Sequence, residues 1–155
     1  MIMKLSYDVV HCLNGKTLAT AESCTGGGIG AAITSVSGSS KVFKGGIISY
    51  TNEIKIRLLG VDKELLSREG AVSAPVAEAM ACGARKALKA DIAVSVTGLA
   101  GPDGDDFGNP VGTVYIGYCD SQQCISHHFR FEGGRDAVRK QVVTAALELI
   151  LEYNK

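Results

Sequence analysis

Residues 18–33 read LATAESCTGGGIGAAI, and this stretch decides the fold because an apolar segment runs through a polar, glycine-rich turn into a second apolar segment. The pattern predicts a strand over 17–22 and a helix after the glycines. A turn at a helix N-terminus offers unpaired backbone N–H groups and the positive end of the helix dipole, which suit an oxyanion or a phosphate. Ser23, Cys24 and Thr25 lie in this turn, so it could carry a nucleophile, bind an anion, or only cap the helix with a hydroxyl.

The rest of the chain alternates between strand-like and helix-like segments. Strands are predicted at 46–50, 91–97, 112–119 and 124–131, and helices at 5–13, 52–59, 62–69, 75–89 and 135–152. The last two strands are joined by a short turn, which predicts an antiparallel hairpin. The order of elements predicts an α/β fold, a single-domain three-layer α/β/α sandwich around a mixed, mainly parallel sheet, over residues 1–155.

Composition restricts the classes of partner. The 155 residues include 16 Lys and Arg against 16 Asp and Glu, with five Tyr, four Phe and no Trp, so we expect neither a nucleic-acid partner nor binding to a membrane. No apolar run approaches the ~18 residues that would span a bilayer. Five cysteines at irregular spacing, without a CxxC pair, indicate reduced thiols, and we expect a cytoplasmic protein.

A base for Ser23 is expected at the next strand-to-helix junction, where residues 50–55 read YTNEIK. If the strands before the two junctions are parallel neighbours, Tyr50 and Lys55 lie at the same edge of the sheet as Ser23. The helix dipole and burial would both lower the pKa of Lys55 toward that of a useful base, unless Lys55 is a solvated surface lysine. Tyr50 would relay a proton or bind the substrate. The three histidines offer no oriented base to Cys24, which therefore ranks below Ser23 as a nucleophile.

Two further segments carry groups suited to an anion. The turn at Thr97-Gly98 follows a strand and offers a hydroxyl and backbone N–H groups, unless it is only a tight loop. Arg135 and Arg139 lie one turn apart at the start of the last helix, which suits a phosphate or a carboxylate, unless they only form a charged helix face. The acidic run 103–106 lacks the remaining ligands of a calcium loop, so no metal site is expected.

Several motifs occur together and in order: AESCTGG, GSSKVFKGGIISYTNEIKIRLLGV, GAVSAPVAEAMA, SVTGLAGPDG with PVGTVY, and GGRDAVR. They cover about residues 5–150. In these motifs the chain resembles the CinA C-terminal domain family, in its stand-alone form, whose characterised members include nicotinamide-nucleotide amidohydrolases. The resemblance implies hydrolysis of the carboxamide of nicotinamide mononucleotide to nicotinate mononucleotide and ammonia, in pyridine nucleotide recycling, with no metal and no other cofactor.

The resemblance also implies roles for individual residues. Ser23 is the implied nucleophile, and Lys55 and Tyr50 are its implied activating partners. The implied substrate-binding positions, which include the backbone around the oxyanion, are Cys24, Thr25, Gly26, Ser39, Ser40, Thr97, Gly98 and Arg135. The implied partner is a small-molecule nucleotide, and formation of a homo-oligomer is left open. Two alternatives also stay open, namely a non-catalytic nucleotide-binding module of the same fold and an amidase that uses Cys24.

Overall fold

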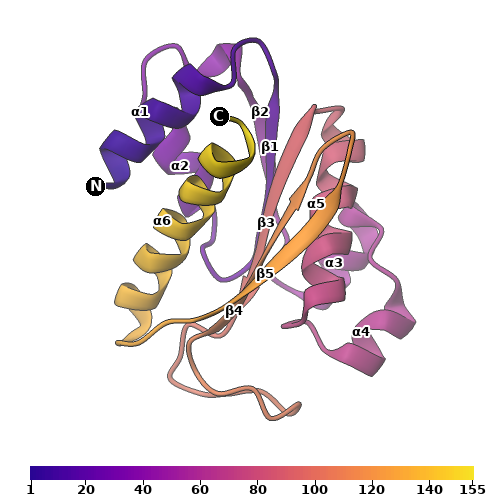
Figure 1. The fold of residues 1–155 in the computed structure, drawn as a ribbon. Helices are drawn as coiled ribbons and strands as arrows, with labels where there is room; N and C mark the ends of the chain where they lie inside the picture. Colours follow the sequence, from indigo (N-terminus) through magenta and orange to yellow (C-terminus); the bar gives the residue numbers. More distant parts are fainter.

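Five strands form one sheet in the order β2-β1-β3-β4-β5 in the computed structural model, which describes residues 1–155 (Figure 1). Strands β2, β1 and β3 are parallel, whereas β4 pairs antiparallel with β3 and β5 pairs antiparallel with β4. The strands are β1 Leu18–Glu22, β2 Phe43–Ile48, β3 Ile92–Gly98, β4 Thr113–Cys119 and β5 Cys124–Arg130. The predicted mixed sheet with a parallel centre is confirmed.

Helices cover both faces of this sheet, as the predicted three-layer sandwich requires (Figure 1). One face carries α1, α2 and α6 over a core of 23 buried residues, and the other carries α3, α4 and α5 over a second core of 10. The helices are α1 Ile2–Cys12, α2 Gly28–Thr34, α3 Asn52–Leu59, α4 Lys63–Glu69, α5 Ala74–Leu88 and α6 Arg135–Tyr153. None of these helices combines the length and the apolar composition that a membrane span requires.

The central strand β1 determines which edge of the sheet carries the candidate site. All five of its residues are buried, and its last residue, Glu22, pairs with Ile48 of β2 and Val96 of β3. The carboxyl ends of the three parallel strands therefore meet at one edge of the sheet. The chain leaves β1 through α2 on one face and leaves β2 through α3 on the other, which creates the crevice where open α/β sheets bind ligands.

The second strand differs from its predicted range of 46–50. It begins at Phe43, which pairs with Leu18, and it ends at Ile48, so Tyr50 lies beyond the strand. Pairing along β1 extends the strand back through Gly45 to Phe43. Thr51 caps α3 by accepting the N–H of Ile54 at 3.4 Å.

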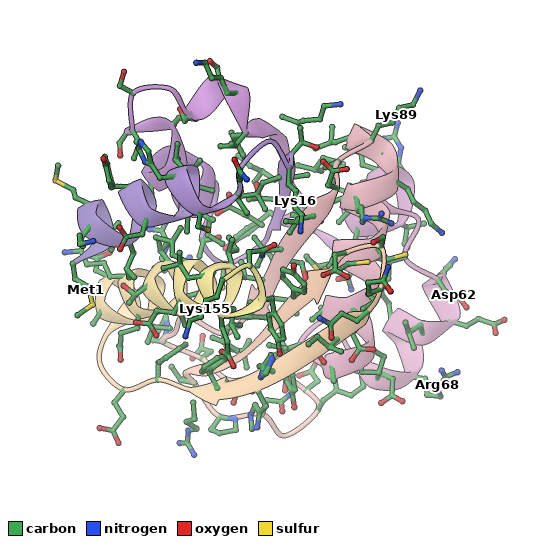
Figure 2. The ribbon with its side chains drawn as sticks, turned by 45° about the horizontal axis from the view of Figure 1, so that its top comes forward. Met1, Lys16, Asp62, Arg68, Lys89 and Lys155 are labelled. Atoms are coloured by element: carbon green, nitrogen blue, oxygen red, sulfur yellow. The ribbon has the colours of Figure 1, made fainter.

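The opposite edge of the sheet is where β1 and β3 begin. Figure 2 shows Lys16 and Lys89 at this end, just before those two strands, with Asp62 and Arg68 marking the outer helix α4. Ser39–Lys41 form a short 3-10 helix that leads into β2 at the same end.

Candidate active site

Ser23 and Lys55 come together at the carboxyl edge of the parallel strands. Ser23 directly follows β1, and Lys55 lies in the first turn of α3, which begins just after β2. The Nζ atom of Lys55 is 3.2 Å from the Oγ atom of Ser23. Ser23 is 8% exposed and Lys55 only 1%, so the pair is nearly closed to bulk water.

Two backbone carbonyls hold the Lys55 amine in place. Its Nζ donates to the carbonyl oxygen of Ser49 at 2.8 Å and to that of Tyr50 at 3.2 Å. Burial lowers the pKa of Lys55 to about 8, and the nearby Cys24 opposes this shift. Burial, one of the two causes named in the prediction, lowers this pKa. The alternative of a solvated surface lysine is wrong.

Tyr50 contacts the Ser23–Lys55 pair through its backbone, while its phenol lies next to Arg135. Its carbonyl oxygen accepts from Lys55, and Ser23 Oγ lies 3.5 Å from the same oxygen. Its side chain is 58% exposed, and its hydroxyl lies 3.4 Å from a terminal nitrogen of Arg135. The phenol makes no hydrogen bond to Lys55, so the predicted proton-sharing contact between the two side chains is not present.

A cavity of about 330 Å³ opens over the Ser23–Lys55 pair. It is lined by segments at or just after the ends of β1, β2 and β3, by the start of α3, by the loop before α5 and by Arg135 of α6. The polar or flexible groups that line it include Ser23, Cys24, Tyr50, Asn52, Lys55, Thr97, Gly98, Asp103 and Arg135. Thus the structure brings together most of the residues proposed from the sequence.

The hydroxyl of Thr97 makes a structural hydrogen bond at the carboxyl edge of the sheet. It is 1% exposed and donates to the carbonyl oxygen of Ala71 at 2.8 Å, which fixes the loop before α5 against β3. Thr97 and Gly98 still line the cavity. Ser39 and Ser40 do not, because they precede β2 and therefore lie at the amino edge of the sheet. Ser40 lines a separate cavity there with Lys41 and Lys44.

The turn after β1 is held by Glu22, which the sequence analysis did not select. The Oε1 atom of Glu22 accepts from the Thr25 hydroxyl at 2.7 Å and from the Ile29 N–H at 2.8 Å, and Oε2 accepts from the Gly30 N–H at 3.0 Å. Glu22 therefore satisfies the first turn of α2. Neither Ser23 nor Thr25 caps the helix, whose N-cap is Gly27 with a φ of 102°. No common capping spacing in the sequence indicates this contact.

Arg135 and Arg139 have different partners. Arg135 is exposed, lines the cavity and donates to the carbonyl oxygen of Gly101 at 2.6 Å. Arg139 instead donates from Nε to the carbonyl oxygen of Cys24 and from a terminal nitrogen to that of Thr25, each at 3.1 Å. The prediction that both arginines face one anion is wrong, because the Arg139 guanidinium is occupied by the turn.

The thiol of Cys24 is not activated. Burial raises its pKa to about 11, although Arg139 and Lys55 act in the opposite direction. The thiolate is the reactive form of cysteine, so this environment disfavours Cys24 as a nucleophile. All five cysteines are free. No group of three or more His, Cys, Asp or Glu side chains is arranged to hold a metal ion.

Known proteins resemble this chain over nearly its whole length. The nicotinamide-nucleotide amidohydrolase PncC of Escherichia coli K12 is 45% identical over 152 residues, which cover 96% of this chain and 92% of that protein. A CinA-like protein of Citrifermentans bemidjiense is 51% identical over 140 residues, but the chain spans only 34% of its length.

Solved structures agree with this relationship. The competence/damage inducible protein CihA of Agrobacterium tumefaciens has a TM-score of 0.95 at 39% identity, with 99% of this chain and 96% of that one covered. A CinA superfamily protein of Escherichia coli has a TM-score of 0.97 at 32% identity, with 99% and 90% covered. The model of the CinA C-terminal domain matches residues 4–154. The chain therefore belongs to the CinA C-terminal domain family.

Proposed function

We propose that this chain hydrolyses the carboxamide of nicotinamide mononucleotide to nicotinate mononucleotide and ammonia, with Ser23 as nucleophile and Lys55 as base. The observation that carries the proposal is the 3.2 Å contact between the buried Lys55 Nζ and Ser23 Oγ. The name of the E. coli relative, a nicotinamide-nucleotide amidohydrolase at 45% identity, supports the choice of substrate.

The contacts of Lys55 suit a neutral amine that takes a proton from serine. A neutral amine has two N–H groups and one lone pair. When protonated, Lys55 donates to Ser23 Oγ and to the carbonyl oxygens of Ser49 and Tyr50. Once Lys55 is neutral, the two carbonyl oxygens can still accept its two N–H groups, and the lone pair is then left for the hydroxyl of Ser23. With a pKa of about 8, an appreciable fraction of Lys55 is neutral near pH 7 and is ready to act as a base.

In the first step, Ser23 Oγ attacks the carboxamide carbon while its proton passes to Lys55. The tetrahedral intermediate carries an oxyanion, for which the N–H groups of Cys24 and Thr25 are the proposed donors. These two groups have no hydrogen-bond acceptor within the chain. Lys55 then returns the proton to the leaving nitrogen, so ammonia departs and a Ser23 ester remains. Water, deprotonated by Lys55, cleaves this ester and restores both residues.

The cavity offers a place for the rest of the nucleotide. Its volume of about 330 Å³ lies at the lower end of the range of roughly 300–1,000 Å³ for small-molecule sites. Arg135 is the cationic side chain that lines it besides Lys55, and we assign it to the 5′-phosphate. The Tyr50 hydroxyl, next to Arg135, is placed to contact the same part of the substrate.

Release of ammonia from nicotinamide mononucleotide in the presence of EDTA tests the proposal. The unaltered protein should release ammonia, and Ser23→Ala should lower the rate by at least about 10³-fold, because the nucleophile is removed. Calorimetry on the same two proteins should show that Ser23→Ala still binds the nucleotide. Binding without ammonia release by the unaltered protein would favour a non-catalytic nucleotide-binding module, and full activity of Ser23→Ala would overturn the mechanism.

A further inference from the structure

The turn that carries Ser23 is held from two sides by charged side chains that do not line the cavity. Glu22 lies at the end of β1, is 2% exposed and accepts three hydrogen bonds from the start of α2. Arg139 lies one turn into α6 and donates to two carbonyl oxygens of the turn. Neither residue is among those that line the space above Ser23.

The two side chains bind opposite kinds of group in the turn: Glu22 binds hydrogen-bond donors and Arg139 binds acceptors. The Glu22 carboxylate accepts the hydroxyl of Thr25 and two backbone N–H groups, so it fixes the end of the turn that enters α2. The Arg139 guanidinium donates hydrogen bonds to the carbonyl oxygens of Cys24 and Thr25, on the side of the turn that faces α6. Hydrogen bonds with one charged partner are roughly twice as strong as neutral ones, which suits them to fix a backbone conformation.

The Arg139 contact also determines which way one backbone N–H points. The peptide bond between Cys24 and Thr25 is trans, because the only cis bond in the chain precedes Pro102. In a planar trans peptide, the C=O and N–H groups point in opposite directions. Arg139 holds the Cys24 carbonyl, so the N–H of Thr25 is directed away from Arg139. That N–H has no acceptor within the chain.

We propose that Glu22 and Arg139 are positioning residues, which orient the backbone of the Ser23 turn so that its free N–H groups can hold the oxyanion. The proposal rests on the hydrolytic function proposed above. Arg139 also withdraws electron density from the peptide whose N–H is the donor, which makes that N–H a stronger hydrogen-bond donor in the transition state. Neither side chain contacts the substrate, so both act on the rate of the chemical step rather than on binding.

The experiment compares Glu22→Gln, Arg139→Gln and Arg139→Lys with two matched controls. Glu78→Gln removes a half-buried carboxylate that accepts from Ser126, and Arg68→Gln removes an exposed guanidinium on α4 (Figure 2). For each protein, kcat and KM are measured with nicotinamide mononucleotide. The rate at which p-nitrophenyl acetate acylates Ser23 is followed by mass spectrometry, and thermal melting reports folding.

We expect kcat to fall by about 10- to 100-fold in Glu22→Gln and Arg139→Gln, with KM within about threefold of the unaltered value. Acylation of Ser23 should slow to a similar extent. Arg139→Lys should recover part of the loss because it keeps the charge and one hydrogen bond to the turn. Both controls should keep their rates. Arg139 lies partly at the surface of α6, so its variants are expected to fold even if Glu22→Gln melts early.

Two results would overturn the proposal. Unchanged kcat and acylation in folded Arg139→Gln would mean that the turn keeps its geometry without the guanidinium. A raised KM with an unchanged kcat would instead place Arg139 at the substrate. Failure of the proposed function looks different, because the unaltered protein would then release no ammonia from nicotinamide mononucleotide while Ser23 would still be acylated in an Arg139-dependent way.

Discussion

At the carboxyl ends of β1 and β2, the polar side chains of Ser23 and Lys55 are buried beneath a cavity, whereas at the amino ends of β1 and β3, Thr17 and Asp91 lie near the surface and bind each other. The carboxyl edge holds Ser23 and Lys55, 8% and 1% exposed. At the amino edge, Asp91 Oδ2 accepts from the N–H and the hydroxyl of Thr17, and the Thr17 hydroxyl in turn accepts from the Asp91 N–H at 3.0 Å.

The contrast shows how one sheet separates reactivity from stability. The carboxyl edge retains groups without partners in the folded chain, including the N–H groups of Cys24 and Thr25 and the buried hydroxyl of Ser49. Such groups destabilise a fold unless a ligand satisfies them, and they collect at functional sites for that reason. At the amino edge, Thr17 and Asp91 satisfy each other, so this pair contributes to stability.

Replacing Lys55 should give the largest loss after that of Ser23 itself, and it tests whether the carboxyl edge is reactive because of its buried amine. Lys55→Met keeps the length and apolar stem of the side chain but removes the base. We expect kcat to fall by about 10²- to 10⁴-fold, the usual contribution of general base catalysis. Ammonia release from nicotinamide mononucleotide measures this loss. Activity close to that of the unaltered protein would remove Lys55 from the mechanism.

The pH profile of the unaltered protein gives an independent reading of the same amine. The neutral form of Lys55 is the base, and its pKa is lowered to about 8, so kcat/KM should rise with pH and level off above about 8. A profile that is flat between about pH 6 and pH 9 would contradict the assignment.

The buried Lys55 amine should also lower the free energy of unfolding at neutral pH. The folded-state pKa of about 8 lies below the ordinary value of 10.5, so the unfolded chain binds more protons between these two values and stability rises with pH. From about pH 7 to about pH 11, the unaltered protein should gain about 3 kcal/mol relative to Lys55→Met. Urea unfolding of both proteins across this range measures the difference, and parallel stability curves would show that Lys55 titrates normally.

The sequence predicted the reactive edge better than it predicted the contacts within it. Two strand-to-helix junctions on parallel neighbours necessarily bring Ser23 and Lys55 to one edge, and the structure does so at 3.2 Å. The range of β2 was wrong at both ends, because pairing with β1 extends the strand back to Phe43 and ends it at Ile48. The sequence did not indicate whether the Lys55 side chain is buried, because its neighbours Glu53 and Arg57 are exposed. The burial of Lys55 follows only from the packing of α3 against α5.

The support of the turn could not be predicted from local sequence at all. Arg139 lies 115 positions from Cys24 along the chain, and its contact depends on how α6 packs beside α2. Glu22 reaches Ile29 and Gly30 across seven and eight positions, outside the usual capping pattern. Ser39 and Ser40 were grouped with the site through resemblance alone, and the direction of β2 carries them to the other edge.

Arg135 allows a test of binding at the carboxyl edge separately from chemistry. Arg135→Gln removes the cation that we assign to the phosphate but leaves Ser23 and Lys55 in place. We expect KM for nicotinamide mononucleotide to rise by about 10- to 100-fold, the effect of losing a hydrogen-bonded charge, with a smaller change in kcat. Arg68→Gln, on the outer helix α4, should leave both constants unchanged (Figure 2). A fall in kcat at constant KM would instead give Arg135 a part in the chemical step.

Asp91 provides the smallest expected effect and tests the amino edge. Hydrogen bonds from the N–H and the hydroxyl of Thr17 lower the pKa of Asp91, so its contribution is present above the ordinary value of 3.8 and is lost as the pH falls through the lowered value. Because Asp91 is exposed, Asp91→Ala should reduce the free energy of unfolding at pH 7 by only about 1 kcal/mol. Ammonia release should not change, since the residue lies at the edge remote from Ser23. A loss of activity in a folded Asp91→Ala protein would show that the two edges are coupled, and the separation of reactivity from stability would then be wrong.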